Sequence, residues 1–364
     1  DEYAPEVNYL ITEKGTFYFK EAEGETAILV DYNGKATKDD HVVIPATFND
    51  RTVTTIGERS FQGCTALTGV RLHEGLVSLG AYAFQGCDSL TGVTIPKSME
   101  TIGNYAFHEC SGMVELTIPD TTVKLGTYCF GNCKGLRTVT LPVDYDFSSN
   151  PFAANSGSDH TNGVTTIHYT FGQTGVMTDR VGNTNNLLSH NRTLEHASRN
   201  SIQSIDFEDG ITHVGNYLFY YGSTTLNQIN LPNSLQTIGS YAFNDCTALS
   251  SIDFNEGLVS LGDHAFEGCK SFPALPEFPD SLTTVGGYAF ADCDGLQELT
   301  IPKSVTSIGT RAFYGCDNLR ELTIPNIKLT IGSYAFGNCK GLRTVTLPVD
   351  YDITGNPFGS NYTN

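Results

Sequence analysis

The sequence predicts a β-rich solenoid, a right-handed coil of stacked parallel strands and short helical turns with about 23 residues per coil. One phrase, Ile-Gly-x-Tyr-Ala-Phe-x-x-Cys in its commonest form, occurs ten times, and within each run the copies are 23 or 24 residues apart. Such a period is typical of solenoids. Before most copies, apolar and polar residues alternate as they do in a half-buried strand. The glycines of the ten copies are Gly57, Gly80, Gly103, Gly126, Gly215, Gly239, Gly262, Gly286, Gly309 and Gly332.

One coil can be followed from Leu90 to Cys110. Val93 and Ile95 belong to the alternating stretch, which Pro96 ends because proline cannot donate a ladder hydrogen bond. The glycine of the phrase predicts a turn with positive φ, and Tyr-Ala-Phe predicts one tight helical turn that carries the phenylalanine inward. A single coil cannot bury its own apolar residues, so the coils must stack, with parallel strands about 4.8 Å apart.

Residues 1–40 lack the repeat and are expected to form an N-terminal capping hairpin. Two apolar stretches, 17–19 and 27–30, flank Glu23-Gly24-Glu25, which is the pattern of two strands and a turn. The hairpin would cover the exposed edge of the first coil. Residues 41–364 are assigned to the solenoid.

The coils at about 143–200 are degenerate and expanded by loops. The strand pattern persists at 164–169 and at 202–207, which predicts two coils in this part of the chain instead of a linker. The polar run 172–200 is expected to bulge from one coil as a long mobile loop.

A segment of 17 residues, FGNCKGLRTVTLPVDYD, occurs at 130–146 and again, unchanged, at 336–352. The same offset of 206 residues maps 150–152 onto 356–358, both Asn-Pro-Phe, which indicates a segmental duplication. By this register Asn364 lies inside a coil. We therefore expect either that the natural protein continues or that its last residues form a brief closing loop.

The composition excludes several classes of partner. With 40 Asp and Glu against 21 Lys and Arg, the chain has a formal net charge of -19, and a polyanion such as nucleic acid is not an expected partner. The longest apolar runs span only a few residues, so no membrane insertion is expected. The phrases of nucleotide-binding loops, serine hydrolases and zinc peptidases are absent from the sequence, so no enzyme activity is predicted.

The repeat resembles that of the BspA-like leucine-rich-repeat proteins found on the surfaces of gut and oral bacteria. Leu296 to Cys316, LQELTIPKSVTSIGTRAFYGC, follows the family pattern at every position, and the resemblance covers about residues 41–352. It implies a leucine-rich-repeat-like solenoid in a secreted or surface-attached bacterial protein, after removal of a signal peptide. It also implies an adhesin-like protein without enzyme activity, which binds host matrix proteins or other cells. We expect the protein to be a monomer.

The cysteines predict buried free thiols. Nine of the ten occupy one repeat position, and the tenth, Cys129, occupies the alanine position. Neighbouring thiols in such a ladder would point in parallel, an orientation that does not favour disulfides. No C-x-x-C pair is present to favour a metal. Disulfides and a metal stay as alternatives.

Two columns of side chains are candidate binding surfaces. Stacked tyrosines could form a sugar-binding strip, with packing over the edge of the coil as the alternative. A ladder of outward threonines could form a flat recognition surface, or could simply reflect the preference of threonine for exposed strands. The tyrosine candidates are Tyr82, Tyr105 and Tyr128, and the threonines are Thr94, Thr117, Thr140, Thr300, Thr323 and Thr346.

Calcium is the one cofactor that the sequence suggests. Asp144 and Asp146 stand at the same place in the duplication as Asp350 and Asp352, and the second pair begins a stretch similar to the start of a calcium loop. Asn361 stands where such a loop would have its last acidic ligand, so a solvated turn is the alternative. The histidines of the degenerate coils, His160, His168, His190 and His196, fit no zinc spacing and are expected at the surface.

We therefore predict a non-enzymatic recognition protein at the cell surface or outside the cell, with an extracellular protein or glycan as its ligand. The main hypothesis is adhesion through the extended repeat surface. The alternatives are a carbohydrate-binding protein that uses the tyrosine column and the 172–200 loop, and a structural spacer.

Overall fold

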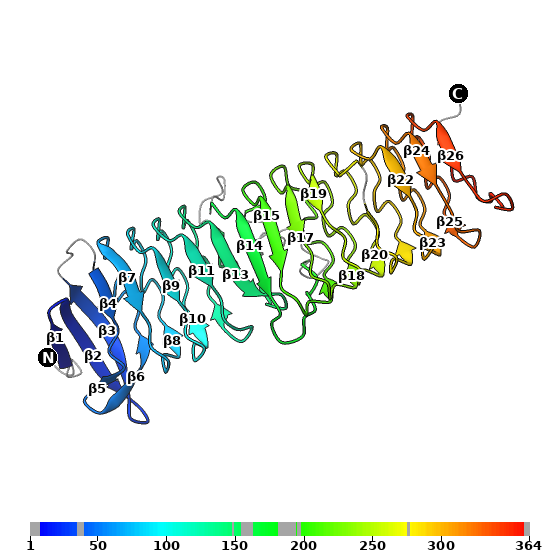
Figure 1. Ribbon diagram of the computed structural model, residues 1–364. Coiled ribbons are helices and arrows are strands. Elements are labelled where there is room, and N and C mark those ends of the chain that lie inside the picture. Colours follow the sequence, from blue (N-terminus) through cyan, green and yellow to red (C-terminus); the bar gives the residue numbers. More distant parts are fainter. Residues whose placement is uncertain are drawn as a thin grey trace. The chain divides into compact units, whose positions relative to one another are not determined.

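The computed structural model describes residues 8–34, 40–147, 149–153, 163–180, 194, 198–274 and 277–359. Two compact units are present. Unit 1 comprises Asp1–Thr165 and Asn191–Ser198, and unit 2 comprises Thr166–His190 and Arg199–Asn364. Each unit is a stack of coils in which short parallel strands follow one another along the chain (Figure 1).

In the described residues, a regular coil has three segments that bond to the next coil. In the coil from Leu90 to Cys110, the first segment contains β9 (Gly92–Thr94) and the second contains β10 (Thr101–Ile102). The third is the Tyr-Ala-Phe segment, where backbone bonds also run from coil to coil, for example from Phe84 N to Ala106 O at 2.7 Å. Because all three segments use their backbone donors between coils, the repeat needs no helix to satisfy them.

The first segments of unit 1 pair in parallel. β4 (Asp40–Val43) pairs with β7 (Leu67–Arg71), and β9 pairs with β11 (Glu115–Thr117), which pairs with β13 (Thr138–Pro142). The second segments form a row of β6 (Arg51–Ile56), β8 (Ser78–Leu79), β10 and β12 (Lys124–Leu125). Alternate strand residues such as Leu116 are buried, as their spacing predicts.

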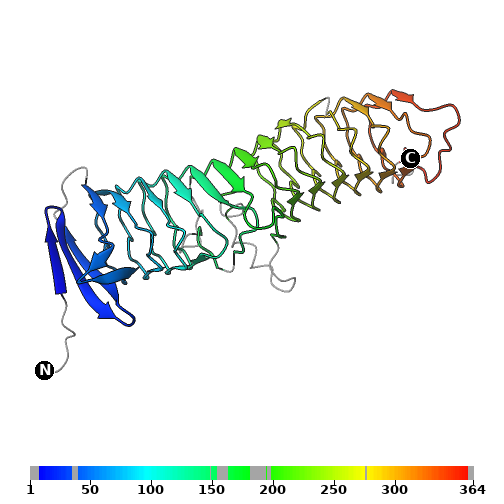
Figure 2. The ribbon, with the colours of Figure 1, turned by 60° about the horizontal axis from the view of Figure 1, so that its bottom comes forward.

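The N-terminal strands extend this second row. β1 (Asn8–Thr12), β2 (Gly15–Ala22) and β3 (Thr26–Gly34) are antiparallel, and β3 pairs in parallel with β6. β5 (Thr47–Phe48) pairs with β6 in a tight antiparallel turn. Figure 2 shows these strands in blue at the start of unit 1. Phe19 stacks on Phe48 at 4.3 Å between ring centroids, which joins the N-terminal strands to the core of the first coils.

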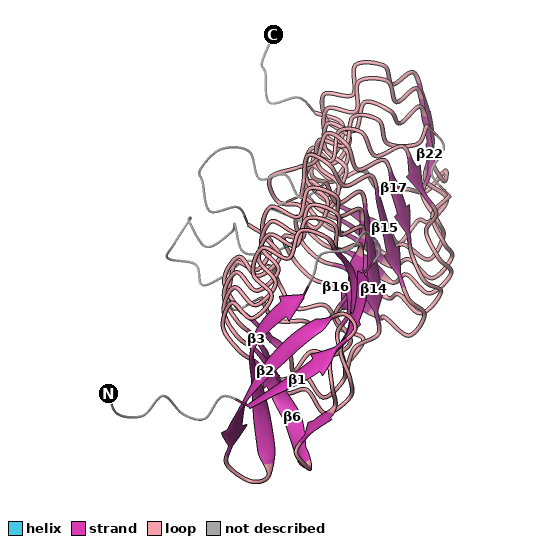
Figure 3. Ribbon diagram, turned by 90° about the vertical axis from the view of Figure 1, so that its left-hand side faces the viewer, coloured by secondary structure: helices cyan, strands magenta, loops and turns pink. Residues whose placement is uncertain are grey.

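Unit 2 repeats the same plan. Its first segments are β14 (Thr166–Thr170), β15 (Ser204–Phe207), β17 (Gln228–Asn230) and β19 (Ser251–Ile252), followed by β22 (Glu298–Thr300), β24 (Glu321–Thr323) and β26 (Thr344–Thr346). Its second segments are β16 (His213–Val214), β18 (Thr237–Ile238), β20 (Ser260–Leu261), β21 (Thr284–Val285), β23 (Ser307–Ile308) and β25 (Thr330–Ile331). The strands are short and the turns between them long, as Figure 3 shows.

The prediction of strands in the degenerate coils is confirmed. β14 and β15 pair in parallel, with Ile167 opposite Ile205 and Tyr169 opposite Phe207. The expectation for the beginning of the 172–200 run is wrong, because residues 175–180 form the second segment of a coil. Thr212 N donates to Gly175 O at 2.8 Å and Met177 N to His213 O at 3.0 Å. Met177 is buried, which adds apolar contact to these backbone bonds.

Stacked phenylalanines form the centre of each unit. Phe84 and Phe107 lie 5.1 Å apart between ring centroids with planes 2° apart, and Phe107 and Phe130 lie 5.4 Å apart. In unit 2 the same ladder runs through Phe266 and Phe290 at 5.4 Å. The ring spacing follows the coil rise, so one buried phenylalanine per coil keeps the core continuous.

The repeat glycine has a different role from the one predicted. It does not adopt a positive φ. A Cβ on Gly103 would lie 2.6 Å from Ala81 N and 2.6 Å from the carbonyl carbon of Gly80. The glycine is therefore required because the backbones of successive coils touch there, and no side chain fits between them.

The positive φ belongs to the residue two places after that glycine. Tyr82 and Tyr105 both have φ of 58°, and Arg59, His264 and Arg311, which replace tyrosine in other coils, have 59°, 58° and 55°. A left-handed residue cannot continue a right-handed helix. The Tyr-Ala-Phe segment is consequently a series of turns in place of the helical turn that the sequence predicts.

Candidate recognition surfaces

The tyrosine column of unit 1 is a stack of rings. Tyr82 and Tyr105 lie 4.9 Å apart between centroids with planes 5° apart, and Tyr128 follows at 5.3 Å from Tyr105 with a tilt of 46°. The guanidinium of Arg59 lies 4.7 Å from the centroid of Tyr82, which continues the stack by a cation–π contact. The rings turn their faces to one another, which fits the packing alternative. Sugar binding by these tyrosines stays a prediction.

In unit 2 other residues enter the same column. The imidazole of His264 stacks between Tyr241 at 4.3 Å and Tyr288 at 4.7 Å. His264 Nδ1 also lies 2.6 Å from Glu267 Oε2. Arg311 lies over Tyr288 and hydrogen-bonds to its hydroxyl. Planar side chains of three types therefore fill this position, and what they share is a flat group that stacks.

The threonine rows lie where the sequence places them, on the outer side of the first segments. In unit 1 Thr117 of β11 stands opposite Thr94 of β9 and Thr140 of β13. In unit 2 the corresponding row is formed by Thr300, Thr323 and Thr346 of β22, β24 and β26. These side chains are exposed or half-buried. Binding through the threonine rows is a prediction that the geometry permits.

Thr94 and Thr117 also line a groove of about 680 Å³ across β4, β7, β9 and β11. Val43 and Val114, with 61% and 44% of their surface exposed, stand beside it. At its floor, Gly92 has no side chain, and a Cβ placed on it would have Glu115 O as its nearest neighbour, at 3.5 Å. Gly92 therefore deepens the groove, since it places no side chain on the outer face.

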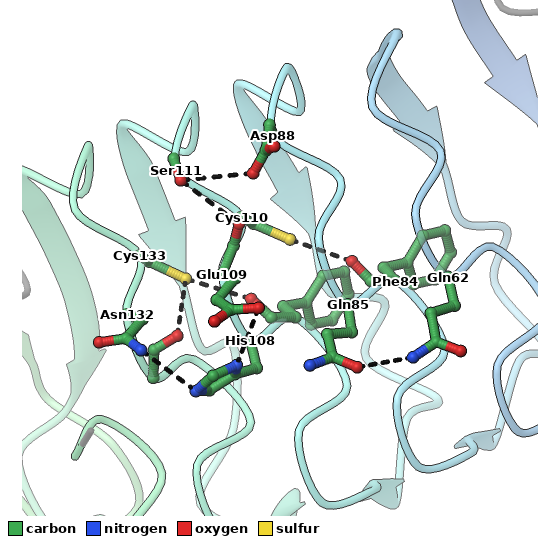
Figure 4. Close-up of polar contacts among 12 residues, drawn as sticks. Gln62, Phe84, Gln85, Asp88, His108, Glu109, Cys110, Ser111, Asn132 and Cys133 are labelled. Carbon is green, nitrogen blue, oxygen red and sulfur yellow. Dashed lines mark hydrogen bonds and ion pairs between the residues drawn. The ribbon is translucent and has the colours of Figure 1, made fainter. Parts of the chain in front are cut away.

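The thiols bond to the coil before them. Cys110 Sγ donates to Phe84 O and Cys133 Sγ to Phe107 O, both at 3.2 Å (Figure 4). All ten cysteines are free, eight of them buried and Cys64 and Cys339 half-buried. Burial raises the pKa of Cys133 to about 12. The thiols thus serve as neutral hydrogen-bond donors inside the fold.

The aspartates proposed for calcium lie at turns. Asp144 is half-buried and Asp146 exposed after β13, and Asp350 and Asp352 are exposed after β26. Within the described residues, no three His, Cys, Asp or Glu side chains lie close enough to hold a metal ion. Asn361 lies outside the described residues. Calcium binding stays a prediction for which the described residues offer no ready site.

Of the histidines considered for zinc, only His168 is described, and its Nδ1 lies 2.7 Å from Asp206 Oδ2 on the next strand. His160, His190 and His196 lie outside the described residues, as does most of the 172–200 run. The carbohydrate-binding role given to this loop is therefore a prediction about residues that are mostly not described.

A second groove, in unit 2, was not predicted from the sequence. It has a volume of about 780 Å³ and runs along the third segments of successive coils. Its lining includes tyrosines, two lysines and five carboxylates: Tyr220, Tyr221, Tyr241, Lys270, Lys340, Asp245, Glu267, Asp292, Asp294 and Asp317. The signal that could have shown it is a change of residue type at the position before the repeat cysteine, which alternates between Asp and Gly in this unit.

Ladders of short strands, a phenylalanine core and a thiol in each coil define a leucine-rich-repeat solenoid. The chain belongs to the BspA-type leucine-rich-repeat family, whose model, the BspA type leucine rich repeat region, matches residues 41–157, 195–276 and 274–361 in six copies. The family expected from the repeat is thereby confirmed. Among curated proteins, none is significantly similar to the chain.

Solved structures of similar proteins come from several bacteria. A leucine-rich repeat protein from Bacteroides ovatus is 23% identical, with 92% of this chain and 70% of that chain covered and a TM-score of 0.43. A leucine rich cell surface protein from Faecalibacterium prausnitzii is 22% identical, with 93% and 94% covered and a TM-score of 0.35. The pneumococcal vaccine antigen PcpA is 18% identical, with 96% and 91% covered and a TM-score of 0.36.

The described residues contain no helix long and apolar enough to span a bilayer.

Proposed function

We propose that the chain is a non-enzymatic recognition protein, secreted or held on the surface of a bacterium, which binds proteins of a host matrix or of other cells. The observation that carries the proposal is the repetition of outward side chains at the coil spacing. Thr117 opposite Thr94, and Thr323 opposite Thr300, place identical hydroxyls in rows along each unit. Such rows suit a large partner that is held by many weak contacts.

Family membership supports a repeat protein that acts by contact, and the resemblance to surface proteins of bacteria supports the proposed location. The two grooves are open and lie on the outside of coils, where a macromolecular segment can enter. Neither groove contains a paired nucleophile and base of the kind that catalysis requires. These features favour binding over chemistry.

A binding panel tests the proposal. The purified chain is applied to immobilised matrix proteins, mucin and a glycan array, with and without calcium and under reducing conditions. Saturable binding to a protein is expected, with a weakened response when Thr94, Thr117 and Thr140 are all changed to alanine. Binding only to free glycans would replace the proposal by the carbohydrate-binding alternative, and silence across the panel would favour the spacer.

A further inference from the structure

One position of the repeat differs between the units. The residue directly before the repeat cysteine has a positive φ in every coil where the third segment is regular. In unit 1 it is Gly63, Gly86, Glu109 and Asn132, and in unit 2 it is Asp245, Gly268, Asp292, Gly315 and Asn338. Gly, Asn and Asp are the residues that tolerate this conformation best, so the backbone permits the alternation but does not require its charge.

The alternation exposes two carboxylates along one line. A Cβ on Gly268 would lie 2.1 Å from Asp245 Oδ1, and a Cβ on Gly315 would lie 2.2 Å from Asp292 Oδ1. Each carboxylate therefore fills the space left by the glycine of the next coil. Because Asp245 and Asp292 are two coils apart, their carboxylates repeat at about 10 Å along the groove.

The groove holds more negative charge than its own cations balance. Lys340 Nζ lies 2.9 Å from Asp317 Oδ2, which accounts for one of its two lysines. Burial raises the pKa of Asp292, and Glu267, Asp294 and Asp317 raise it further. Lys270 acts in the opposite direction, but the pKa of Asp292 is still raised. A cation placed between these carboxylates would relieve their repulsion.

Aromatic side chains close one end of the groove. Tyr220 and Tyr221 have 39% and 48% of their surface exposed. Tyr220 meets Tyr221 edge-on at 5.2 Å and Tyr241 edge-on at 5.3 Å, so the three rings form a cluster. Exposed tyrosine rings attract cations and also pack against the aliphatic stems of lysine and arginine. The aromatic cluster and the carboxylates thus favour the same kind of ligand.

We propose that this groove binds an extended basic segment of a partner protein, in which lysine or arginine side chains recur every third residue. In a polyproline II conformation such side chains share one face and repeat at about 9.3 Å, which matches the spacing of the Asp245 and Asp292 carboxylates. Their charged groups meet the two aspartates, and an aliphatic stem or a flanking proline packs on Tyr220 and Tyr221. The proposal rests on the proposed function and specifies a class of partner.

Unit 1 provides a natural comparison. At the position that Glu267 occupies in unit 2, unit 1 has Gln62 and Gln85, and Gln62 Nε2 donates to Gln85 Oε1 at 2.7 Å (Figure 4). These amides are joined by one hydrogen bond and carry no charge. In the coils of Gln62 and Gln85, with Gly63 and Gly86 before the cysteines, this part of the third segment carries no carboxylate, and it should not attract a basic segment.

The test uses the full chain and a fluorescent peptide of Lys-Pro-Pro repeats, with a peptide of the same composition whose lysines are contiguous as the comparison. Binding is measured by fluorescence anisotropy at two salt concentrations. We expect the repeat peptide to bind more tightly than the contiguous one, with affinity falling as salt increases. The double variant Asp245→Asn and Asp292→Asn should bind about fivefold to tenfold more weakly.

The controls separate the groove from general acidity. Asn is tolerated at positive φ, so the double variant should unfold at a temperature at least as high as the parent does. Asp88→Asn removes an exposed carboxylate from unit 1 and should leave peptide binding unchanged. Tyr220→Ala with Tyr221→Ala should weaken binding without changing its salt dependence. Equal binding of both peptides, or an unchanged affinity in the aspartate double variant, would overturn the proposal. The matrix panel would stay positive in that case if only the groove is wrongly assigned.

Discussion

Val143 and Val349 occupy the same place in two identical segments of 17 residues, yet Val143 is fully buried and Val349 is fully exposed. The tyrosines two residues later differ in burial in the same way, since Tyr145 is 3% exposed and Tyr351 is only half-buried. Tyr145 and Tyr351 nevertheless make the same hydrogen bond, from their hydroxyls to Val123 O and Leu329 O. Local sequence therefore sets the turn, and the burial of the valine depends on what packs against the turn.

This pair predicts different costs for one substitution. Val143→Ala should lower the free energy of unfolding by about 2 kcal/mol, because it removes buried methyl groups and leaves a cavity. Val349→Ala should change it by less than about 0.5 kcal/mol. Urea unfolding followed by circular dichroism measures both. Equal effects would mean that the two turns are equally covered in solution.

Substitution of the repeat glycine should destabilise the protein through a steric clash and not through backbone strain. Gly103→Ala should destabilise the protein by about 3 kcal/mol, because the new methyl group meets rigid backbone of the preceding coil. Gly92→Ala is the matched control, since its Cβ would have ordinary contacts. It should leave the stability unchanged or raise it by up to about 1 kcal/mol. Thermal unfolding of the two variants decides the matter, and similar melting temperatures would contradict the backbone contact.

The positive φ at the tyrosine position predicts which substitutions destabilise the protein more. At Tyr105, whose φ is 58°, valine should be less stable than asparagine by about 1 to 2 kcal/mol, because a β-branched residue is strained in the left-handed region. Both variants lose the ring stack, so their difference isolates the backbone. Denaturant midpoints of Tyr105→Val and Tyr105→Asn check this. A more stable valine variant would show that the segment adopts a different backbone in solution.

The thiols should react with an alkylating agent at different rates, because their pKa values and burial differ. The hydrogen bond from the Cys316 thiol lowers the pKa of Cys339, which is half-buried, whereas burial raises the pKa of Cys64 to about 12. Iodoacetamide at pH 8 should therefore label Cys339 first, and the buried thiols only after unfolding. Mass spectrometry of timed samples identifies the order. If Cys64 were labelled before Cys339, the assignment of the lowered pKa to Cys339 would be wrong.

The raised pKa of Asp292 predicts how stability depends on pH. The unfolded chain loses this proton at a lower pH than the folded chain does, so ionisation favours the unfolded state. This contribution to stability is present below the unfolded pKa and is lost as pH rises through the folded pKa. Asp292→Asn should therefore be at least as stable as the parent at pH 7, and should lose its advantage near pH 3. Melting curves across this range test the sign.

The sequence was sufficient to predict the coils, because Phe107 and Cys110 recur at one period and only stacking buries them. It was not sufficient to assign the positive φ. Glycine suggests that conformation by its type, but Gly103 is needed for a contact with a neighbouring coil, and spacing alone reveals no such contact. Tyr105 carries the left-handed angle because the stacked backbone forces it, against the preference of its residue type.

The candidate surfaces were predicted unevenly for a similar reason. Thr94 and Thr117 could be placed on one face because strands alternate with a period of two. The unit 2 groove depends on the carboxylate of Asp245 filling the space above Gly268, a contact between coils. In the sequence these residues look like an ordinary acidic surface. What the repeat does not specify is how substitutions in adjacent coils combine.

Seven cysteines donate to the phenylalanine carbonyl of the coil before them, and these bonds make the protein sensitive to oxidation whenever neighbouring coils separate. While Cys133 Sγ is bonded to Phe107 O, the thiol is neutral and shielded. If the two coils separate, the thiol loses its hydrogen bond and becomes exposed to solvent at the same time. Oxidation of the freed sulfur to a sulfenic acid would add a polar atom where the coils must close, and further oxidation to a sulfinic acid would make the damage permanent. The lifetime of such a protein outside a reducing cell is then set by how rarely its coils part, and not by its equilibrium stability.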